Sequence, residues 1–291
     1  MPMTLSDRLQ NHKRLVDEAL GRILSETSSP LHQAMRAAVL SGGKRYRPLL
    51  LLAAGEYFHV SLDRLLPFAC GLELIHNYSL VHDDLPCMDD DDTRRGQPAI
   101  HRTYGEDIAL LTGDALLNLA FEVMTEAPVR DEYIALKVYA IQEISRFSGV
   151  KGMIGGQVLD IRYIPEEATE EQLLDLMAKK TGGLIKAAVR AGGILGDAPE
   201  KSLQALTLYG ENIGLAFQTR DDILDYREDK SENRPTRPNA AHFFGLEPAR
   251  TQLNGYIEGA LKVLRDAGIQ SEFLDYHANR LRVPNVEKRD E

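Results

Sequence analysis

The sequence predicts an all-α protein, because apolar residues recur along it at helical spacing, while alternating strand-like runs with hairpin turns are hard to find. Apolar residues at positions 31, 34, 35, 38 and 39 predict a helix, which we expect to end at the Ser-Gly-Gly that follows. Pro48 suits the first turn of the next helix, whose apolar side is 49–54. The same spacing outlines two longer helices, one through Leu203, Leu206, Ile213, Phe217 and Leu224 and one through Leu253, Ile257, Leu261 and Leu264.

Two segments lack this helical pattern. From Arg227 to Gly245 the chain is polar and carries two prolines, so we expect a mobile surface loop over 227–245. The last residues, 285–291, are expected to fray. Neither an internal repeat nor a Ser- or Gly-rich linker divides the chain, so a single domain over residues 1–291 is the simplest organisation.

Composition and charge argue against several classes of function. The 291 residues include 34 Lys and Arg against 44 Asp and Glu, a formal charge of −10, which argues against nucleic-acid binding. The two cysteines, Cys70 and Cys87, are too few for a disulfide framework, so a cytoplasmic location is expected. The longest apolar run, 49–55, is much shorter than the about 20 residues that span a bilayer, and the amino-terminal residues lack an apolar signal region. We therefore expect neither membrane insertion nor secretion.

The most unusual segment is HDDLPCMDDDDTRRG, which holds six aspartates between Asp83 and Asp92. Carboxylates this close repel one another unless cations or hydrogen bonds compensate, and Mg²⁺ prefers carboxylate and water oxygens. Pro86 interrupts the preceding helical stretch, which places Asp83 and Asp84 near a helix carboxyl end that favours cations. The alternative is a solvated acidic loop. The register of an EF-hand calcium loop is absent.

A second acidic cluster, QTRDDILDYRED, lies within a predicted amphipathic helix. Asp221, Asp222 and Asp225 share one side of that helix, and Gln218 lies one turn before them on the same side. Taken alone, such a cluster is more often an exposed helix face than a metal site. If both clusters line one cavity, however, they can hold several Mg²⁺ ions, and those ions can bind a diphosphate that the net charge repels.

Short groups of cationic and small residues supply further phosphate-type contacts. They are Lys44 and Arg47 in GGKRYRP, Arg94 and Arg95 after the first acidic cluster, and Lys180 and Thr181 in KTGG. Arginine offers a planar fork to phosphate oxygens, and neighbouring glycines allow backbone N–H groups to approach. Each group has an alternative reading as a helix cap followed by surface charge. His76 lies two turns before the first acidic cluster, near enough to reach a ligand there, although a structural role is the default.

Five motifs together resemble the trans-isoprenyl diphosphate synthases: GGKRYRP, HNYSLVHDDLPCMDDDDTRRG, GGQVLD, KTGGL and FQTRDDILD, in this order. The resemblance covers residues 10–226 closely and is weaker from Gly245 onward. The expanded first motif, DDxxxxD, is similar to bacterial farnesyl diphosphate synthases and some geranylgeranyl synthases. The family resemblance implies an all-α isoprenoid synthase bundle around a deep central cavity. Such proteins are commonly homodimers, and their two aspartate motifs face each other at the cavity mouth.

The same resemblance implies roles for individual residues. Mg²⁺, as several ions in one site, would be bound by Asp83, Asp89, Asp221 and Asp225. The catalytic role would fall to Asp83, Asp84, Asp89, Lys180, Asp221 and Asp222, with Asp84 and Asp222 supporting the metal cluster. The allylic diphosphate would contact Arg94, Lys180, Thr181 and Gln218, and isopentenyl diphosphate would contact Lys44, Arg47, His76 and Arg95.

The implied reaction is the head-to-tail condensation of isopentenyl diphosphate with dimethylallyl or geranyl diphosphate to give farnesyl diphosphate. In this family the residue five before the first motif influences product length, and here it is Tyr78. Five helical residues rise about 7.5 Å, so a bulky ring at that depth is expected to stop the chain at a short product. A core tyrosine without a gating role is the alternative. Two other functions remain open: a geranylgeranyl diphosphate synthase, and a non-catalytic partner subunit of a prenyl synthase.

The sequence departs from the family pattern after DDILD. Members of the family continue with a loop that carries GK, a GxD element and a second Lys-Thr, whereas this chain reads YREDKSENRPTRPNAAHFFG. Lys230 is a candidate replacement for one of the lost cations. We expect the altered loop to weaken substrate affinity or closure without removing the chemistry, because both acidic clusters are intact.

Overall fold

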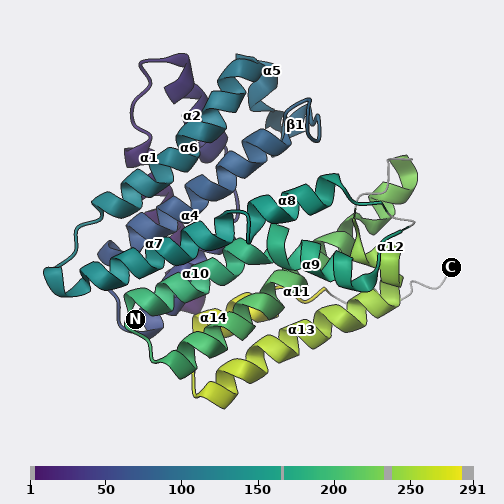
Figure 1. Cartoon of the computed structure of the whole chain (residues 1–291). Coiled ribbons are helices and arrows are strands. Elements are labelled where there is room, and N and C mark those ends of the chain that lie inside the picture. The colour runs from purple at the N-terminus through teal and green to yellow at the C-terminus, as the bar shows by residue number, and fades with distance from the viewer. Residues whose placement is uncertain (1–3, 165–166, 233–237, 284–291) are drawn as a thin grey trace. The chain divides into compact units, whose positions relative to one another are not determined.

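The structure is a computed structural model that describes residues 4–164, 167–232 and 238–283, although the side chains of 227–232 lie outside the description. The described residues are mostly helical, as the sequence predicts (Figure 1). They form two compact units. Unit 1 comprises Met1–Ser145 and Ala188–Ala198, and unit 2 comprises Arg146–Ala187 and Pro199–Glu291.

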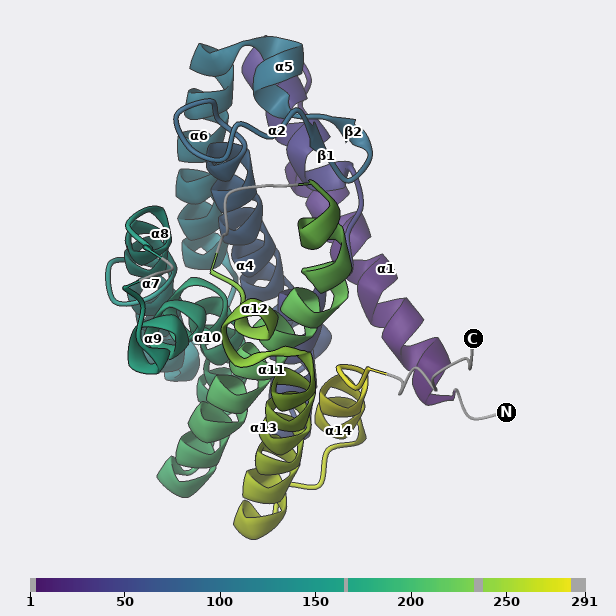
Figure 2. The same ribbon diagram turned by 90° about the vertical axis from the view of Figure 1, so that its right-hand side faces the viewer.

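Unit 1 is built around one buried helix. Its elements are α1 (Leu5–Ile23), α2 (Pro30–Leu40), α3 (Tyr46–Tyr57), α4 (Leu62–Asp83), β1 (Thr93–Arg94), β2 (Gln97–Pro98), α5 (Ile100–Tyr104), α6 (Glu106–Glu126), a 3₁₀ turn (Asp131–Tyr133) and the larger part of α7 (Ile134–Ser148). Helix α4 packs against α3 and α6 (Figure 2). Phe68, Leu72 and Ile75 of α4 are fully buried, and each such side chain stabilises the fold by about 1.5–3 kcal/mol.

The helix predicted from position 31 is confirmed as α2, and its ends follow from the local sequence. Ser29 caps the amino end by accepting from the backbone N–H of His32, and Pro30 occupies the first turn. After the helix, Gly42 and Gly43 have φ angles of 103° and 130°, which only glycine adopts readily. The chain therefore leaves α2 in a tight loop over 41–45 and enters α3, the second predicted helix, at Tyr46.

Unit 2 is also helical and contains both longer helices that the spacing predicts. Its elements are α8 (Met153–Ile161), α9 (Glu170–Lys180), the first part of α10 (Gly182–Leu195), α11 (Glu200–Glu232), α12 (Ala240–Phe244), α13 (Leu246–Ala267) and α14 (Glu272–Asn279). Helices α11 and α13 lie side by side in both ribbon views (Figures 1 and 2). Ile213 on α11 and Leu253 and Ile257 on α13 are buried in this unit.

The segment 227–245, expected to be a loop, has helix at both ends. Helix α11 continues to Glu232, because Arg, Glu and Lys in REDKSE favour helix despite their polarity. Near the other end, Asn239 accepts from the backbone N–H of His242 and starts α12. Residues 233–237 lie outside the described residues, as do the side chain of Lys230 and the expected frayed tail 285–291.

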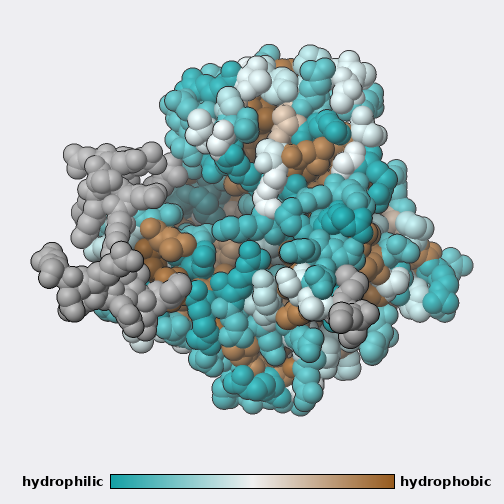
Figure 3. Space-filling model, turned by 180° about the vertical axis from the view of Figure 1, so that it is seen from behind, coloured by the Kyte–Doolittle hydropathy of each residue, from teal (hydrophilic) through white to brown (hydrophobic). Residues whose placement is uncertain are grey.

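Within the described part of the chain, one helix, α6, is long enough and apolar enough to cross a membrane, judged by length and composition alone. It starts with Glu106 and Asp107 and packs against α4 inside unit 1. Ala109, Leu116 and Ala120 on this helix are buried, so α6 serves as a core helix of the unit. The face drawn in Figure 3 is mainly hydrophilic and carries its hydrophobic residues in separate patches.

Candidate active site

The first acidic segment begins where α4 ends. The helix stops at Asp83, with Asp84 as its C-cap, which confirms the break predicted from Pro86. The following turn folds back on the helix end, because the backbone N–H of Asp89 donates to the carbonyl of Asp83 at 2.8 Å. This turn brings the backbones of Asp83 and Asp89 together although six positions separate them. Both residues are half-buried.

A small hairpin after the acidic run positions Arg94 and Arg95. Strands β1 and β2 pair antiparallel and are joined by Arg95 and Gly96, whose φ angles are 53° and 75°. Two consecutive positive φ angles are typical of the tight hairpin turns that follow the twist of the strands. Arg94 ends strand β1 and Arg95 begins the turn, and the two adjacent arginines contact different partners.

Arg94 is directed at the carboxylates of its own segment. Its Nε donates to Asp84 Oδ1 at 2.9 Å and its Nη2 forms a second short contact with the same oxygen. Nη2 also donates to Asp91 Oδ2 at 3.0 Å. Burial raises the pKa of Asp84, which is only 2% exposed, and the bonded Arg94 opposes that rise. The carboxylate of Asp84 therefore fixes Arg94 in place.

Arg95 belongs to a cationic cluster that also contains Arg47 and His76. Arg95 Nη1 donates to the carbonyl of Gly42 at 2.6 Å, so it lies over the loop that carries Lys44. Burial of the ring and the nearby positive charge of Arg47 and Arg95 hold the pKa of His76 well below its usual range. His76 is thus neutral at neutral pH. Like charges gathered in this way favour an anion at the same place.

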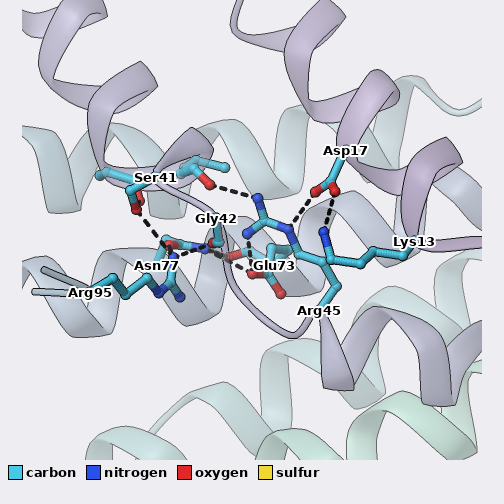
Figure 4. Close-up of polar contacts among 10 residues, drawn as sticks. Lys13, Asp17, Ser41, Gly42, Arg45, Glu73, Asn77 and Arg95 are labelled. Carbon is cyan, nitrogen blue, oxygen red and sulfur yellow. Dashed lines mark hydrogen bonds and ion pairs between the residues drawn. The ribbon is translucent and has the colours of Figure 1, made fainter. Parts of the chain in front are cut away.

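Sequence reasoning missed Arg45, a buried residue at the end of this loop. Its side chain is 1% exposed and donates to Asp17 at 2.7 Å, to Glu73 at 2.6 Å and to the carbonyl of Val39 at 2.8 Å (Figure 4). Burial by itself disfavours the charge of Arg45, but the two carboxylates raise its pKa. A signal was present in the sequence, because Glu73 is a lone carboxylate in the apolar run FACGLELI and therefore needs a buried cation.

Tyr78, the predicted chain-length residue, is buried in unit 1. It is 6% exposed, and its ring meets the imidazole of His82 edge to face with centroids 5.8 Å apart. Burial and the charge of Asp83 raise the pKa of Tyr78 to about 12, so the phenol is neutral. His82 is held in turn by the carbonyl of Leu110 on α6, 3.0 Å from its Nε2.

The second acidic cluster lies on α11 in unit 2, with its members on one side of the helix as predicted. Asp222 is 5% exposed, whereas Asp221 is half-buried and Asp225 is exposed. Asp222 Oδ1 accepts from Gln218 Nε2 at 2.8 Å, and Oδ2 accepts from the backbone N–H of Ala240 at 2.7 Å. Burial nevertheless raises the pKa of Asp222 to about 7, because both donors are neutral.

The KTGG motif joins this cluster through Gln218. Thr181 Oγ1 donates to Gln218 Oε1 at 2.5 Å, so the amide connects the motif to Asp222. Lys180 forms a short ion pair with Asp160, the aspartate of GGQVLD, a partner that sequence reasoning did not assign. A Cβ on Gly156 would lie 2.2 Å from the backbone N of Lys180, which explains a glycine in that motif. The structure thus brings together Lys180, Thr181, Gln218 and Asp222 within unit 2.

The carboxylates that the sequence assigns to a metal suit a hard divalent cation. Among the residues that the structure describes, no group of three or more His, Cys, Asp and Glu is gathered as a metal site. Mg²⁺ does not require such a group, because it usually binds through one or two carboxylates and completes its shell with waters and substrate phosphates. In unit 1 a hydrogen bond holds the backbones of Asp83 and Asp89 together, and their side chains offer oxygen donors only.

Comparisons with known proteins agree with these motifs. Residues 28–236 match the polyprenyl synthetase family. The farnesyl diphosphate synthase of Bacillus subtilis (strain 168) is 36% identical over 288 residues, which cover 94% of this chain and 96% of that protein. The geranylgeranyl diphosphate synthase of Cyanophora paradoxa is 36% identical over 265 residues and 87% of each chain. A crystal structure of an FPP/GFPP synthase from Zymomonas mobilis, in its apo form, superposes with a TM-score of 0.85 at 33% identity, covering 95% of this chain and 98% of that one.

Proposed function

The chain belongs to the polyprenyl synthetase family and is a prenyltransferase, and we propose that its product is farnesyl diphosphate. The substrates of the family are isopentenyl diphosphate and allylic diphosphates. In the proposed reaction, dimethylallyl or geranyl diphosphate is extended head to tail by isopentenyl diphosphate. Relatives of similar identity include both farnesyl and geranylgeranyl synthases, so the product length rests on the residues of this chain.

One observation carries the proposal: in unit 1 the half-buried Asp83 and Asp89 meet at the end of α4, and the hairpin that follows them places Arg95 in the cationic cluster around His76 of the same helix. Asp83 and Asp89 supply oxygen ligands there, and Arg47 and Arg95 supply positive charge. A diphosphate with its metal ions requires both. The proposal further requires Asp221 and Asp225 of unit 2 to line the same cavity as the first motif and to share the metal cluster.

The family is typically Mg²⁺-dependent, and in this chain we assign the metal ions to Asp83, Asp89, Asp221 and Asp225. Bound Mg²⁺ would neutralise the charge that grows on the departing diphosphate. Arg94, Lys180, Thr181 and Gln218 would hold the allylic diphosphate so that its C–O bond breaks and the electron pair leaves with the phosphate oxygen. Asp84, Asp160 and Asp222 would position these groups, because they already bind Arg94, Lys180 and Gln218 in the protein.

Isopentenyl diphosphate is assigned to Lys44, Arg47, His76 and Arg95. Its double bond would attack the allylic carbon, form the new C–C bond and lose a proton to the released diphosphate, which restores a double bond. Because His76 is neutral at neutral pH, it would contribute a hydrogen bond to this substrate and not a charge. The reaction would require an apolar pocket that excludes water, because water would capture the cation as an alcohol.

Tyr78 supports a short product, since it is a buried ring five residues before Asp83 on α4. Replacing it by alanine should lengthen the product if the ring blocks the growing chain. The purified protein is incubated with labelled isopentenyl diphosphate, each allylic starter and Mg²⁺, and the products are sized by chromatography. Farnesyl product from the wild type and longer product from Tyr78→Ala are expected.

Each other outcome of this assay is informative. Geranylgeranyl product from the wild type would assign the chain to the longer synthases. Turnover only after addition of a second prenyl synthase would assign it a non-catalytic partner role. An unchanged product distribution in Tyr78→Ala would leave the ring as a core residue.

We also propose a cytoplasmic homodimer that pairs through α6 and α7. These helices expose the side chains of Leu110, Leu111, Val138 and Tyr139 in unit 1. Leu110 and Leu111 are adjacent in the sequence, as are Val138 and Tyr139, and exposed apolar side chains of this kind are typical of a protein interface. Sedimentation equilibrium is expected to give twice the chain mass for the wild type, and the chain mass alone would contradict this interface.

A further inference from the structure

The guanidinium of Arg95 is held by three neutral oxygens, whereas those of Arg45 and Arg94 are bound by carboxylates. Its Nη1 donates to the carbonyl of Gly42 at 2.6 Å and lies 3.4 Å from both Ser41 Oγ and Asn77 Oδ1. A Cβ on Gly43 would be 3.2 Å from Arg95 Cζ, so the guanidinium packs against the glycine backbone. The loop 41–43 and Asn77 therefore fix the direction of Arg95.

The side-chain amide of Asn77 can adopt only one orientation, because its NH₂ group is already hydrogen-bonded to Glu73. The residue is 1% exposed, and its Nδ2 donates to the carbonyl of Glu73 at 2.7 Å and to Glu73 Oε1 at 3.3 Å. With the NH₂ group bound there, only the carbonyl oxygen can face Arg95. The orientation of Asn77 is thus determined by Glu73, one turn earlier on α4.

Glu73 is itself fixed by the buried ion pair with Arg45. The side chains of Arg45 and Glu73 are 1% and 2% exposed, and Arg45 Nη1 lies 2.6 Å from Glu73 Oε1. Arg45 also binds Asp17 on α1, which accepts from Lys13 at 2.6 Å (Figure 4). Removing one partner of such a buried pair leaves an uncompensated charge, so the pair resists rearrangement. The contacts therefore run from α1 through Arg45, Glu73 and Asn77 to Arg95.

The choice of an amide at position 77 matters for the charge of Arg95. Arg94, its neighbour, is bound by the carboxylates of Asp84 and Asp91, which compensate its charge. A neutral acceptor directs a guanidinium without forming an ion pair with it, so Arg95 can still pair with an anion, although the nearby carboxylates of Glu73 and Asp84 also attract it. A carboxylate in place of Asn77 would bind Arg95 tightly and repel a phosphate.

We propose that Asn77 is a positioning residue that aims Arg95 at the diphosphate of isopentenyl diphosphate, with the Glu73–Arg45 pair fixing its orientation. This inference rests on the proposed function, because that function assigns the second substrate to Arg95. Asn77 acts through Arg95 and does not itself contact the substrate.

The test is the nearly isosteric Asn77→Asp variant of the full chain. Its KM for isopentenyl diphosphate should rise about tenfold or more, because the new carboxylate competes for Arg95, while the KM for geranyl diphosphate changes less than about twofold. Asn254→Asp is the matched control, since Asn254 Oδ1 also lies 3.4 Å from an arginine Nη1, that of Arg282. The control should keep both KM values.

Asn77→Ala tests the same contact without adding a buried charge. It should also raise the KM for isopentenyl diphosphate, and its effect should disappear in an Arg95→Lys background, as expected when two residues act together. Circular dichroism checks that each variant is folded. If neither variant folds, or if both fold with the wild-type KM, or if the effects of Asn77→Ala and Arg95→Lys add independently, the inference is overturned. A wild type without turnover would instead overturn the proposed function.

Discussion

In unit 1 the buried Asp84 faces a guanidinium, whereas in unit 2 the buried Asp222 faces an amide and a backbone N–H. Both follow a less buried aspartate, Asp83 in one pair and Asp221 in the other. Arg94 brings a full opposite charge to Asp84, while Gln218 and Ala240 bring only dipoles to Asp222. Accordingly the pKa of Asp222 rises to about 7, close to neutral pH.

The comparison suggests a division of work in which the two aspartates of each pair have different roles. The second, buried member holds a neighbouring group of the site, and the first, more exposed member is the one placed to bind a cation. The two units reach this division by different local means, an ion pair at a helix end in unit 1 and a hydrogen-bonded chain along a helix in unit 2.

The largest expected effect comes from replacing each aspartate by asparagine. Asp83→Asn and Asp221→Asn should lower kcat by about 10²–10³-fold, because a charged ligand of the catalytic site is lost. Asp84→Asn should lower the free energy of unfolding by about 1–3 kcal/mol, since Arg94 loses a charged partner. Asp222→Asn should cost less than Asp84→Asn, because the amide resembles the protonated acid that its raised pKa favours.

Steady-state assays with saturating Mg²⁺ and urea unfolding measure the two effects separately. A loss of stability in Asp83→Asn or Asp221→Asn as large as that in Asp84→Asn would contradict the division of work. Equal losses of stability in Asp84→Asn and Asp222→Asn would show that the ion pair of Asp84 stabilises the protein no more than the neutral donors of Asp222 do.

A smaller effect is expected from the close packing that supports Lys180 in unit 2. Gly156→Ala places a Cβ 2.2 Å from the backbone N of Lys180, so α8 or the end of α9 must shift. Overpacking of this kind costs about 1–3 kcal/mol, which thermal unfolding can measure. Gly255→Ala on α13 is the control, because a Cβ there meets nothing within 4 Å. It should keep or raise stability, because alanine has a higher helix propensity than glycine. An equal loss in both variants would contradict the close packing at Gly156 as the cause.

The smallest effect is a pH dependence in the cationic cluster of unit 1. The folded pKa of His76 lies well below its usual range, whereas the unfolded chain titrates near about 6.5. Below that pH the unfolded state binds a proton that the folded state does not, so stability falls as the pH decreases. The free energy of unfolding of the wild type, relative to that of His76→Gln, should therefore fall by up to about 1 kcal/mol between pH 7.5 and 5.5. Urea unfolding measures this difference. A constant difference would place His76 outside the cluster.

Local signals were sufficient for much of the fold and part of the site. Pro86 predicted the end of α4, and the spacing of Asp221, Asp222 and Asp225 predicted their common helix side. Both depend on a few neighbouring residues. The loop expected over 227–245 failed at its ends, because the helix propensity of charged residues outweighed the low apolar content from which the loop was inferred.

The partners that hold the site could not be predicted in this way. Arg45 binds Asp17, which lies 28 positions earlier in the sequence, and Glu73, which lies 28 positions later. Lys180 binds Asp160, which lies 20 positions earlier. Sequence spacing says nothing about contacts of that range, which depend on how helices pack. A lone charged residue in an apolar helix, such as Glu73, indicates that a buried partner exists without naming it.

The ion pairs of Arg45 also bear on the order in which the protein is made. Both carboxylates that bind this guanidinium precede the first aspartate motif in the chain. On the ribosome, the loop after α2 can therefore acquire its charged supports before the second aspartate motif has been translated. The loop is then held in place early, and the second aspartate cluster, on α11, is made later.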